Sequence, residues 1–234
     1  KITECKQYIL NINIPNNQQE CIKHFKFIYE KFTIDEWLDT NISFELANFI
    51  MEKRPNLLSL AIRMNVQINL FLRTINKFSN NPNEIFNKIG YSLGCFALTE
   101  KNTGVLSGLF LDTIFEENDD EYIINTNDIY KNWISQGFYS DYCILFSKNI
   151  QNEKDVRIFL IDMNNENIKK SKIDNLLVTK SLDLAKLEFN NVSIGKNCLL
   201  EKSKYACLKD HEFISVSGKV IIIGSNCLPP IAPY

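Results

Sequence analysis

The spacing of apolar residues changes near Gly90, and no other feature of the sequence constrains the fold as strongly. Before this point, apolar residues recur every three or four positions, which is the repeat of one face of an α-helix. After it come short runs of alternating, β-branched and aromatic residues, separated by clusters of Asn, Asp and Gly that favour turns. The sequence therefore predicts an α+β fold, in which an all-α N-terminal region precedes an antiparallel β-barrel or sandwich.

The strongest helical signal lies in the second half of the N-terminal region. Its apolar residues share one stripe of a long predicted helix: Leu57, Leu60, Ala61, Met64, Ile68, Phe71, Leu72, Ile75 and Phe78. Asn56 is the expected cap of this helix, and Asn81-Pro82 is the expected stop. Shorter helices are expected around residues 21–32 and 44–51. Aromatic stripes of this kind are interpreted as core.

Several segments after Gly90 have the composition of strands. They are residues 109–115, 122–125, 141–146, 156–162 and 184–189. The acidic, polar spacer 116–121 is expected to form a hairpin loop. The signal weakens after Leu200, and residues 212–227 are expected to form either a strand pair or the first turns of a truncated helix.

Composition argues against several classes of function. The formal net charge is -2, so no basic surface favours a nucleic acid partner. The 7 cysteines include no Cys-x-x-Cys pair, which favours free thiols in an intracellular, reducing compartment. His24 and His211 lie in no cluster with ligand spacing, so no metal site is expected. The longest apolar runs are interrupted by charge before they could span a membrane.

Three short motifs carry the functional signal. The first reads GCFALTE over residues 94–100, and the second reads KNWISQG over residues 131–137. The third is split into LEFNNV at residues 187–192 and NCLL at residues 197–200. In this order and at this spacing, the motifs resemble those of the acyl-CoA dehydrogenase and acyl-CoA oxidase superfamily. Three motifs in order are far more specific than any one of them.

The resemblance implies a domain organisation. Residues 1–94 would form the N-terminal helical domain, and residues 95–200 the β middle domain of acyl-CoA dehydrogenase type. Residues 201–234 would be a C-terminal remnant or the start of a truncated helical domain. Because the chain opens at Lys1 and its last residues do not resemble a domain end, we interpret it as a fragment or a divergent member of the superfamily.

The resemblance also implies FAD as the cofactor. An isoalloxazine ring needs an apolar face and a few donors aimed at its polar edge. Trp133 would supply the face, Thr99 would hydrogen-bond the pyrimidine side, and Ser135 would donate toward the nitrogen that accepts hydride. Further contacts, through the backbone, would come from Phe96, Ala97, Leu98 and Ile134.

These residues also have plain structural interpretations. A Trp in a strand is usually core, and a Thr beside a Glu usually lies in a solvated turn. The ordered pair of motifs favours the flavin interpretation for Trp133 and Thr99. Glu100 is expected to be a structural carboxylate that accepts hydrogen bonds from backbone donors, not an acid or a base.

The chain departs from the family pattern just after Glu100. Gly104 is kept, but Val105 and Leu106 stand where most relatives have Ser followed by Asp or Asn. By resemblance, Gly104 and Val105 belong to the substrate-binding segment. Each hydrogen bond lost to a buried polar group would weaken ligand binding by about 1–3 kcal/mol.

The activity implied by the resemblance is FAD-dependent oxidation of an acyl-CoA thioester to the trans-2-enoyl-CoA, as in fatty acid β-oxidation. Such chemistry needs a carboxylate base within reach of the proton next to the thioester carbonyl. In the superfamily this base is a Glu of a C-terminal helical domain, so no catalytic residue is expected in this chain. The alternative is a non-catalytic acyl-CoA-binding or protein-interaction module that keeps the fold.

The same resemblance implies the partners. The substrate would be an acyl-CoA, and electrons would pass to oxygen or to an electron-transfer flavoprotein. The full-length form is expected to be a homo-oligomer. The compartment would be the mitochondrion for a dehydrogenase and the peroxisome for an oxidase.

Overall fold

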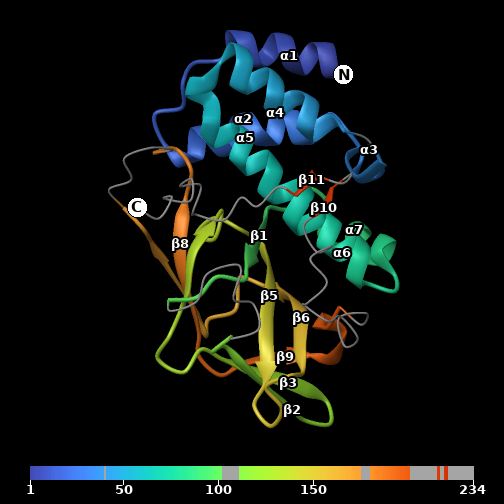
Figure 1. Ribbon diagram of the computed structural model, residues 1–234, viewed down its shortest axis with the longest axis vertical. Helices are drawn as coiled ribbons and strands as arrows, with labels where there is room; N and C mark the ends of the chain where they lie inside the picture. The colour runs from blue at the N-terminus through green and yellow to red at the C-terminus, as the bar shows by residue number, and fades with distance from the viewer. Residues whose placement is uncertain (40, 102–110, 175–179, 201–214, 217–218, 221–234) are drawn as a thin grey trace, which may run out of the picture.

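Helices occupy the upper part of the molecule in Figure 1 and strands the lower part. The predicted α+β fold class is confirmed. The computed structural model describes residues 1–39, 41–101, 111–174, 180–200, 215–216 and 219–220.

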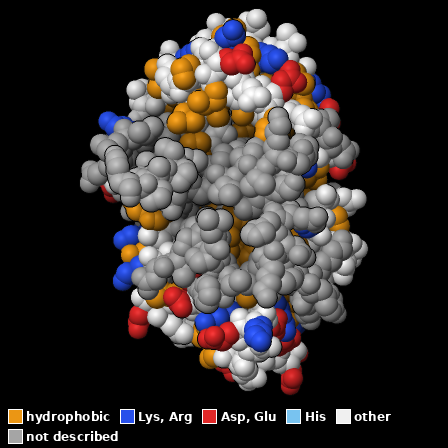
Figure 2. All heavy atoms as spheres, in the orientation of Figure 1, with side chains coloured by type: hydrophobic (Ala, Val, Ile, Leu, Met, Phe, Trp, Pro, Cys, Tyr) orange, Lys and Arg blue, Asp and Glu red, His pale blue; other side chains and the backbone are white. Residues whose placement is uncertain are grey.

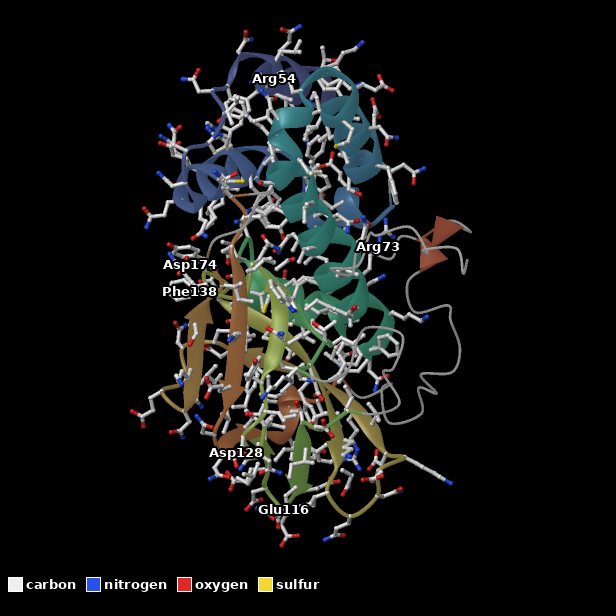
Figure 3. The ribbon with its side chains drawn as sticks, turned by 60° about the vertical axis from the view of Figure 1, so that its left-hand side comes forward. Arg54, Arg73, Glu116, Asp128, Phe138 and Asp174 are labelled. Carbon is white, nitrogen blue, oxygen red and sulfur yellow. The ribbon has the colours of Figure 1, made fainter. Side chains whose placement is uncertain are left out.

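The N-terminal part consists of consecutive helices joined by short turns. They are α1 (Ile2–Asn11), α2 (Gln18–Tyr29), α3 (Ile34–Asp39), α4 (Ile42–Lys53), η1 (Pro55–Leu57), α5 (Leu58–Asn65), η2 (Val66–Leu72), α6 (Arg73–Phe78) and α7 (Pro82–Ile89). The shorter helices predicted around residues 21–32 and 44–51 correspond to α2 and α4. Figure 3 shows Arg54, which follows α4, at the top of the helical part. Its guanidinium donates to the carbonyl groups of Ile9, Leu10 and Ile12 and so satisfies acceptors at the end of α1.

The predicted long helix runs without a break from α5 through η2 to α6, and its middle segment η2 is a π-helix. Every residue of the predicted stripe is buried. The predicted ends were wrong. Asn56 lies inside the 3-10 turn η1 and caps no helix. The long helix already ends at Phe78, and Asn81-Pro82 instead begins α7, where Pro is favoured because its missing N–H would have no helical partner.

The strands that follow form two main sheets. They are β1 (Gly94–Ala97), β2 (Ile114–Glu117), β3 (Glu121–Asn125), β4 (Lys131–Ser135), β5 (Tyr142–Asn149), β6 (Val156–Asp162), β7 (Ile168–Lys172), β8 (Leu184–Phe189) and β9 (Val192–Gly195), with the short helix η4 (Lys196–Cys198) at the end. The larger sheet has the order β1-β5-β2-β3-β9, with β6 added on β5. The smaller sheet has the order β4-β8-β7. Within the described residues every pairing is antiparallel except those of β1 and β2 with β5, which are parallel.

Most of the predicted strands are present. Residues 122–125, 141–146, 156–162 and 184–189 correspond to β3, β5, β6 and β8. The predicted strand at 109–115 reaches outside the described residues, and its end overlaps β2, which pairs with β3 as a hairpin. After Leu200, β10 (Ser215–Val216) and β11 (Lys219–Val220) pair antiparallel. This agrees with the strand-pair alternative.

The core continues from the helices into the sheets through β5. Ile144 and Phe146 belong to the cluster that contains the helical core, whereas Cys143 and Leu145 belong to the cluster between the two sheets. Alternate residues of one strand thus serve both clusters, as the two-residue period of a strand requires. Above β1, the Phe71 ring lies so close to Gly94 that an added Cβ would be 2.2 Å from it. A side chain at this position would clash with the Phe71 ring, so the packing of the long helix on β1 would have to shift.

Candidate functional site

The first two motifs lie side by side, although they are far apart in the sequence. The Asn132 N–H donates to the Thr99 carbonyl over 2.9 Å, and the Lys101 N–H donates to the Tyr130 carbonyl over 3.1 Å. The Thr99 hydroxyl donates to the Asn132 carbonyl over 2.5 Å. The chain after β1 therefore pairs with β4 and its preceding turn, which brings Thr99 next to the Trp133 backbone.

A β-bulge turns Trp133 outward from β4. Lys131 pairs with Leu187 of β8 and Ile134 pairs with Ala185, so Asn132 and Trp133 together face the single residue Lys186. Trp133 has a φ of 59° and is 45% exposed. A bulky residue at positive φ is an outlier that costs about 1–3 kcal/mol, and such residues cluster at functional sites. Trp133 is therefore not the core Trp that its strand position alone would suggest.

The outer face of the smaller sheet surrounds this Trp. Ser135 and its cross-strand partner Leu184 are half-buried, and so is Lys186. Directly paired residues lie on the same side of a sheet, and residues two apart share a face. We call Trp133, Ser135, Leu184 and Lys186 the platform. In Figure 3, Phe138 lies near the upper end of the smaller sheet and Asp128 lies near the lower end. Because β4 lies between these two residues in the sequence, this strand runs along the length of the smaller sheet.

The remaining predicted site residues point away from the platform. Phe96 is half-buried, and its ring packs edge-on against Phe146 with 5.0 Å between ring centroids. Ala97, Leu98 and Ile134 are buried in the hydrophobic clusters. Only their backbone groups are left for a ligand. The predicted substrate-binding residues Gly104 and Val105 lie outside the described residues.

A buried ion pair lies beneath the platform. The Lys131 ammonium is fully buried and donates to Glu100 Oε1 over 2.6 Å and to the Phe146 carbonyl over 2.8 Å. Glu100 also accepts the backbone N–H groups of Asp112 and Thr113, as expected for a structural carboxylate. Burial raises the pKa of the Glu100 carboxyl, but the Lys131 ammonium and the hydrogen bonds outweigh burial, and the pKa lies below its ordinary value of 4.5. Glu100 is thus held ionised, and its carboxylate oxygens are already hydrogen-bonded to Lys131 and to the two backbone N–H groups.

A second buried ion pair joins the helices to the motifs. Arg63 of α5 donates to Asp183 over 2.6 Å and to the Gln136 side-chain oxygen over 3.0 Å. The Gln136 amide in turn donates to the Gly94 carbonyl over 3.0 Å. Asp183 also accepts the N–H groups of Phe138 and Tyr139. One helix side chain is therefore connected to the beginnings of β1 and β8 and to the end of β4.

Sequence reasoning missed both ion pairs. The one available signal for Arg63 is that a charged residue interrupts the stretch between Ala61 and Met64, both of which face the core. For Lys131 the signal is its position in the strand. Simple alternation would place Lys131 and Trp133 on the same side of the sheet, and the bulge breaks this alternation.

The described part of the chain contains no cluster of three His, Cys, Asp or Glu side chains that could hold a metal ion. Nor does any helix in that part have both the length and the apolar character needed to cross a bilayer. Chemically, the platform offers an exposed aromatic plane, a hydroxyl group and an ammonium, with the Thr99 hydroxyl close by. An exposed aromatic plane beside polar groups is suited to contact with a flat ligand.

Comparison with known proteins gives a family match for the β part of the molecule. Residues 95–192 match the family model of the acyl-CoA dehydrogenase middle domain. These residues are therefore similar to the β middle domain of the acyl-CoA dehydrogenase and oxidase superfamily. Within that superfamily, acyl-coenzyme A oxidase 2 of Yarrowia lipolytica is 32% identical over 122 residues, covering 47% of this chain and 17% of the oxidase.

Solved structures of the superfamily share the fold well beyond the matched region. Acyl-CoA oxidase 1 of Yarrowia lipolytica superposes on 86% of this chain and 31% of its own, with a TM-score of 0.69 and 21% identity. Glutaryl-CoA dehydrogenase of Mycobacterium smegmatis, in complex with FADH2, superposes on 87% of this chain and 55% of its own, with a TM-score of 0.68 and 16% identity. The chain thus spans about half the length of that dehydrogenase and less than a third of that oxidase. The resemblance inferred from the three motifs is confirmed.

Proposed function

We propose that the chain is the flavin- and acyl-CoA-binding part of an enzyme that uses FAD to oxidise an acyl-CoA to the trans-2-enoyl-CoA. Residues 1–94 would be its helical domain and residues 95–200 its β middle domain, with residues 201–234 as a C-terminal remnant or the start of a truncated helical domain. The match of residues 95–192 to the acyl-CoA dehydrogenase middle domain and the similarity to an acyl-CoA oxidase support FAD-linked acyl-CoA oxidation in general. The finer assignment rests on the platform.

The observation that carries the proposal is the outward-facing Trp133 beside Thr99. An exposed Trp held at positive φ by a bulge has a conformational cost that a purely structural strand residue would not need. Its plane suits the apolar face of an isoalloxazine ring. The fold shared with a dehydrogenase solved in complex with FADH2 is consistent with this ligand.

The residues around the platform would orient the ring. The Thr99 hydroxyl already gives its hydrogen to the Asn132 carbonyl, which leaves its oxygen to accept from the N–H on the pyrimidine edge. Ser135 would donate toward the ring nitrogen that accepts hydride. Backbone groups of Phe96, Ala97, Leu98 and Ile134 would complete the contacts. Bound FAD would supply the acceptor for the hydride that leaves the substrate.

Proton removal needs a carboxylate from elsewhere. Glu100, which follows Thr99 directly, is bound to Lys131 and to backbone donors and cannot reach a substrate. Glu100 is therefore not the base, and the resemblance would give that role to a Glu of a C-terminal helical domain. Gly104 and Val105 would lie against the acyl-CoA. Electrons would go to an electron-transfer flavoprotein in a mitochondrial dehydrogenase, or to oxygen in a peroxisomal oxidase, and the complete enzyme would be a homo-oligomer.

The alternative is a non-catalytic module that binds acyl-CoA or another protein. It is favoured by Val105 and Leu106, which replace the polar pair found at this place in most relatives. This alternative predicts a chain that binds acyl-CoA and no FAD.

The decisive measurement is the visible absorption spectrum of the purified chain, taken before and after FAD and an acyl-CoA are added. We expect a protein-bound flavin spectrum that Trp133→Ala abolishes. Met51→Ala is the matched control, because Met51 is 47% exposed on α4, in the helical part. Absence of bound flavin at saturating FAD would contradict the proposal, and binding of acyl-CoA alone would then support the alternative.

A further inference from the structure

Two lysines lie against the same aromatic ring beside the platform. The Lys186 ammonium is 4.8 Å from the centroid of the Tyr130 ring, and the Lys101 ammonium is 5.7 Å from the same centroid. Both positions fit a cation–π contact, which is worth about 0.5–1 kcal/mol at an exposed site. Such a contact holds an ammonium in place without neutralising its charge.

These two ammonium groups differ from the other lysines nearby. Lys131 is paired with Glu100, and Lys169 on the outer face of β7 is 2.9 Å from Glu188. The ion pairs found among the described residues include neither Lys101 nor Lys186. Two like charges near one ring repel each other, and an anion bound between them would offset this repulsion. Among the described residues, Lys101 and Lys186 thus lie at the same ring, and neither belongs to an ion pair.

The position of this charge follows from the strand register. Lys186 is the residue of β8 that faces the bulge, so it stands directly across from Asn132 and Trp133. Lys101 is held beside Tyr130 by its backbone hydrogen bond to the Tyr130 carbonyl. Figure 2 shows Lys and Arg side chains at the left-hand edge of the molecule, at the height where Figure 1 shows β8. By register Lys186 borders Trp133, and Lys101 borders Tyr130.

We propose that Lys101 and Lys186, supported by Tyr130, bind the diphosphate group of a nucleotide whose other end lies on the platform. This inference rests on the proposed function, because that function puts a dinucleotide at Trp133. Lysine is well suited to phosphate because its ammonium is a compact point charge with three donors. FAD and coenzyme A both contain a diphosphate, so either could be its source.

The site would also offset a loss visible in the sequence. Val105 and Leu106 provide no polar side chains where most relatives carry Ser and Asp or Asn. Lys101 and Lys186 would instead supply two ammonium donors beside Tyr130.

The test is calorimetric titration of the full chain and of the double variant Lys101→Gln/Lys186→Gln with four probes: FAD, riboflavin, coenzyme A and inorganic pyrophosphate. Lys169→Gln is the matched control, since it removes one charge from the same sheet face away from Tyr130. We expect each lysine to contribute about tenfold to FAD affinity, and riboflavin, which lacks the diphosphate, to bind the two proteins equally. Raised salt should weaken FAD binding to the unmodified chain more than to the double variant.

Each outcome separates this inference from the proposed function. FAD affinity that is unchanged in the double variant overturns the lysine site while the flavin function stands. If the unmodified chain binds no FAD, the proposed function fails. The lysine site then survives only if coenzyme A or pyrophosphate binds the unmodified chain and not the double variant. Binding of none of these probes overturns both proposals.

Discussion

The two sides of β4 differ in burial and in how their charged groups are paired. On the inner side, Lys131 and Ile134 are fully buried, and the Lys131 charge is matched by Glu100. On the outer side, Trp133 is exposed and strained, and Lys186 across from it has no carboxylate partner among the described residues. The comparison teaches that the two sides of the strand have different roles. On the inner side, the paired charges and buried side chains hold β4 in place. This allows the exposed Trp133 ring and the Lys186 ammonium to be presented on the outer side. Three experiments sharpen this contrast.

The largest effect is expected from Lys131→Met, which leaves Glu100 buried without its cation. Breaking one partner of a buried ion pair costs about 3–5 kcal/mol of unfolding free energy. Urea unfolding followed by circular dichroism measures this loss. Adding Glu100→Gln should restore part of it, because the neutral amide is cheaper to bury.

Lys169→Met is the control for this experiment. Lys169 belongs to an ion pair on the same sheet, but its side chain is 63% exposed, so its loss should cost at most about 1 kcal/mol. Equal losses for Lys131→Met and Lys169→Met would show that the inner pair does not hold the strand.

A smaller effect is expected from acid. Because the pKa of Glu100 is lowered in the folded chain, this carboxylate stabilises the fold fully above its ordinary pKa of 4.5. That stabilisation is lost as the pH falls below 4.5 and through the folded-state pKa. Unfolding free energies of the unmodified chain and of Lys131→Met/Glu100→Gln, measured from pH 6 downward, should converge. A constant difference over this range would contradict the assigned pKa direction.

The same contrast explains what the sequence could reveal. The buried stripe of the long helix was predictable because its period depends only on local spacing, and β3, β5, β6 and β8 alternate clearly enough to be found. Strand β7 was missed because three of its five residues are lysines at a sheet edge, which carry no apolar alternation. The motifs assigned Thr99 and Trp133 to one predicted flavin site, and the structure brings their backbones side by side. The Glu100–Lys131 pair, 31 positions apart in sequence, and the bulge both arise from strand pairing, which no local pattern encodes.

The smallest effect on stability, and the most specific one, is expected at Trp133 itself. Its φ of 59° suits glycine, whereas any residue with a Cβ is strained there. Trp133→Gly and Trp133→Ala remove the same indole ring, but only Gly relieves the backbone. Trp133→Gly should therefore be more stable than Trp133→Ala by about 1 kcal/mol in urea unfolding, although Gly usually destabilises a strand. Both variants should lose the flavin spectrum. If the Ala variant is instead the more stable one, the bulge stores no strain, and the outward position of Trp133 must be explained by its side-chain contacts alone.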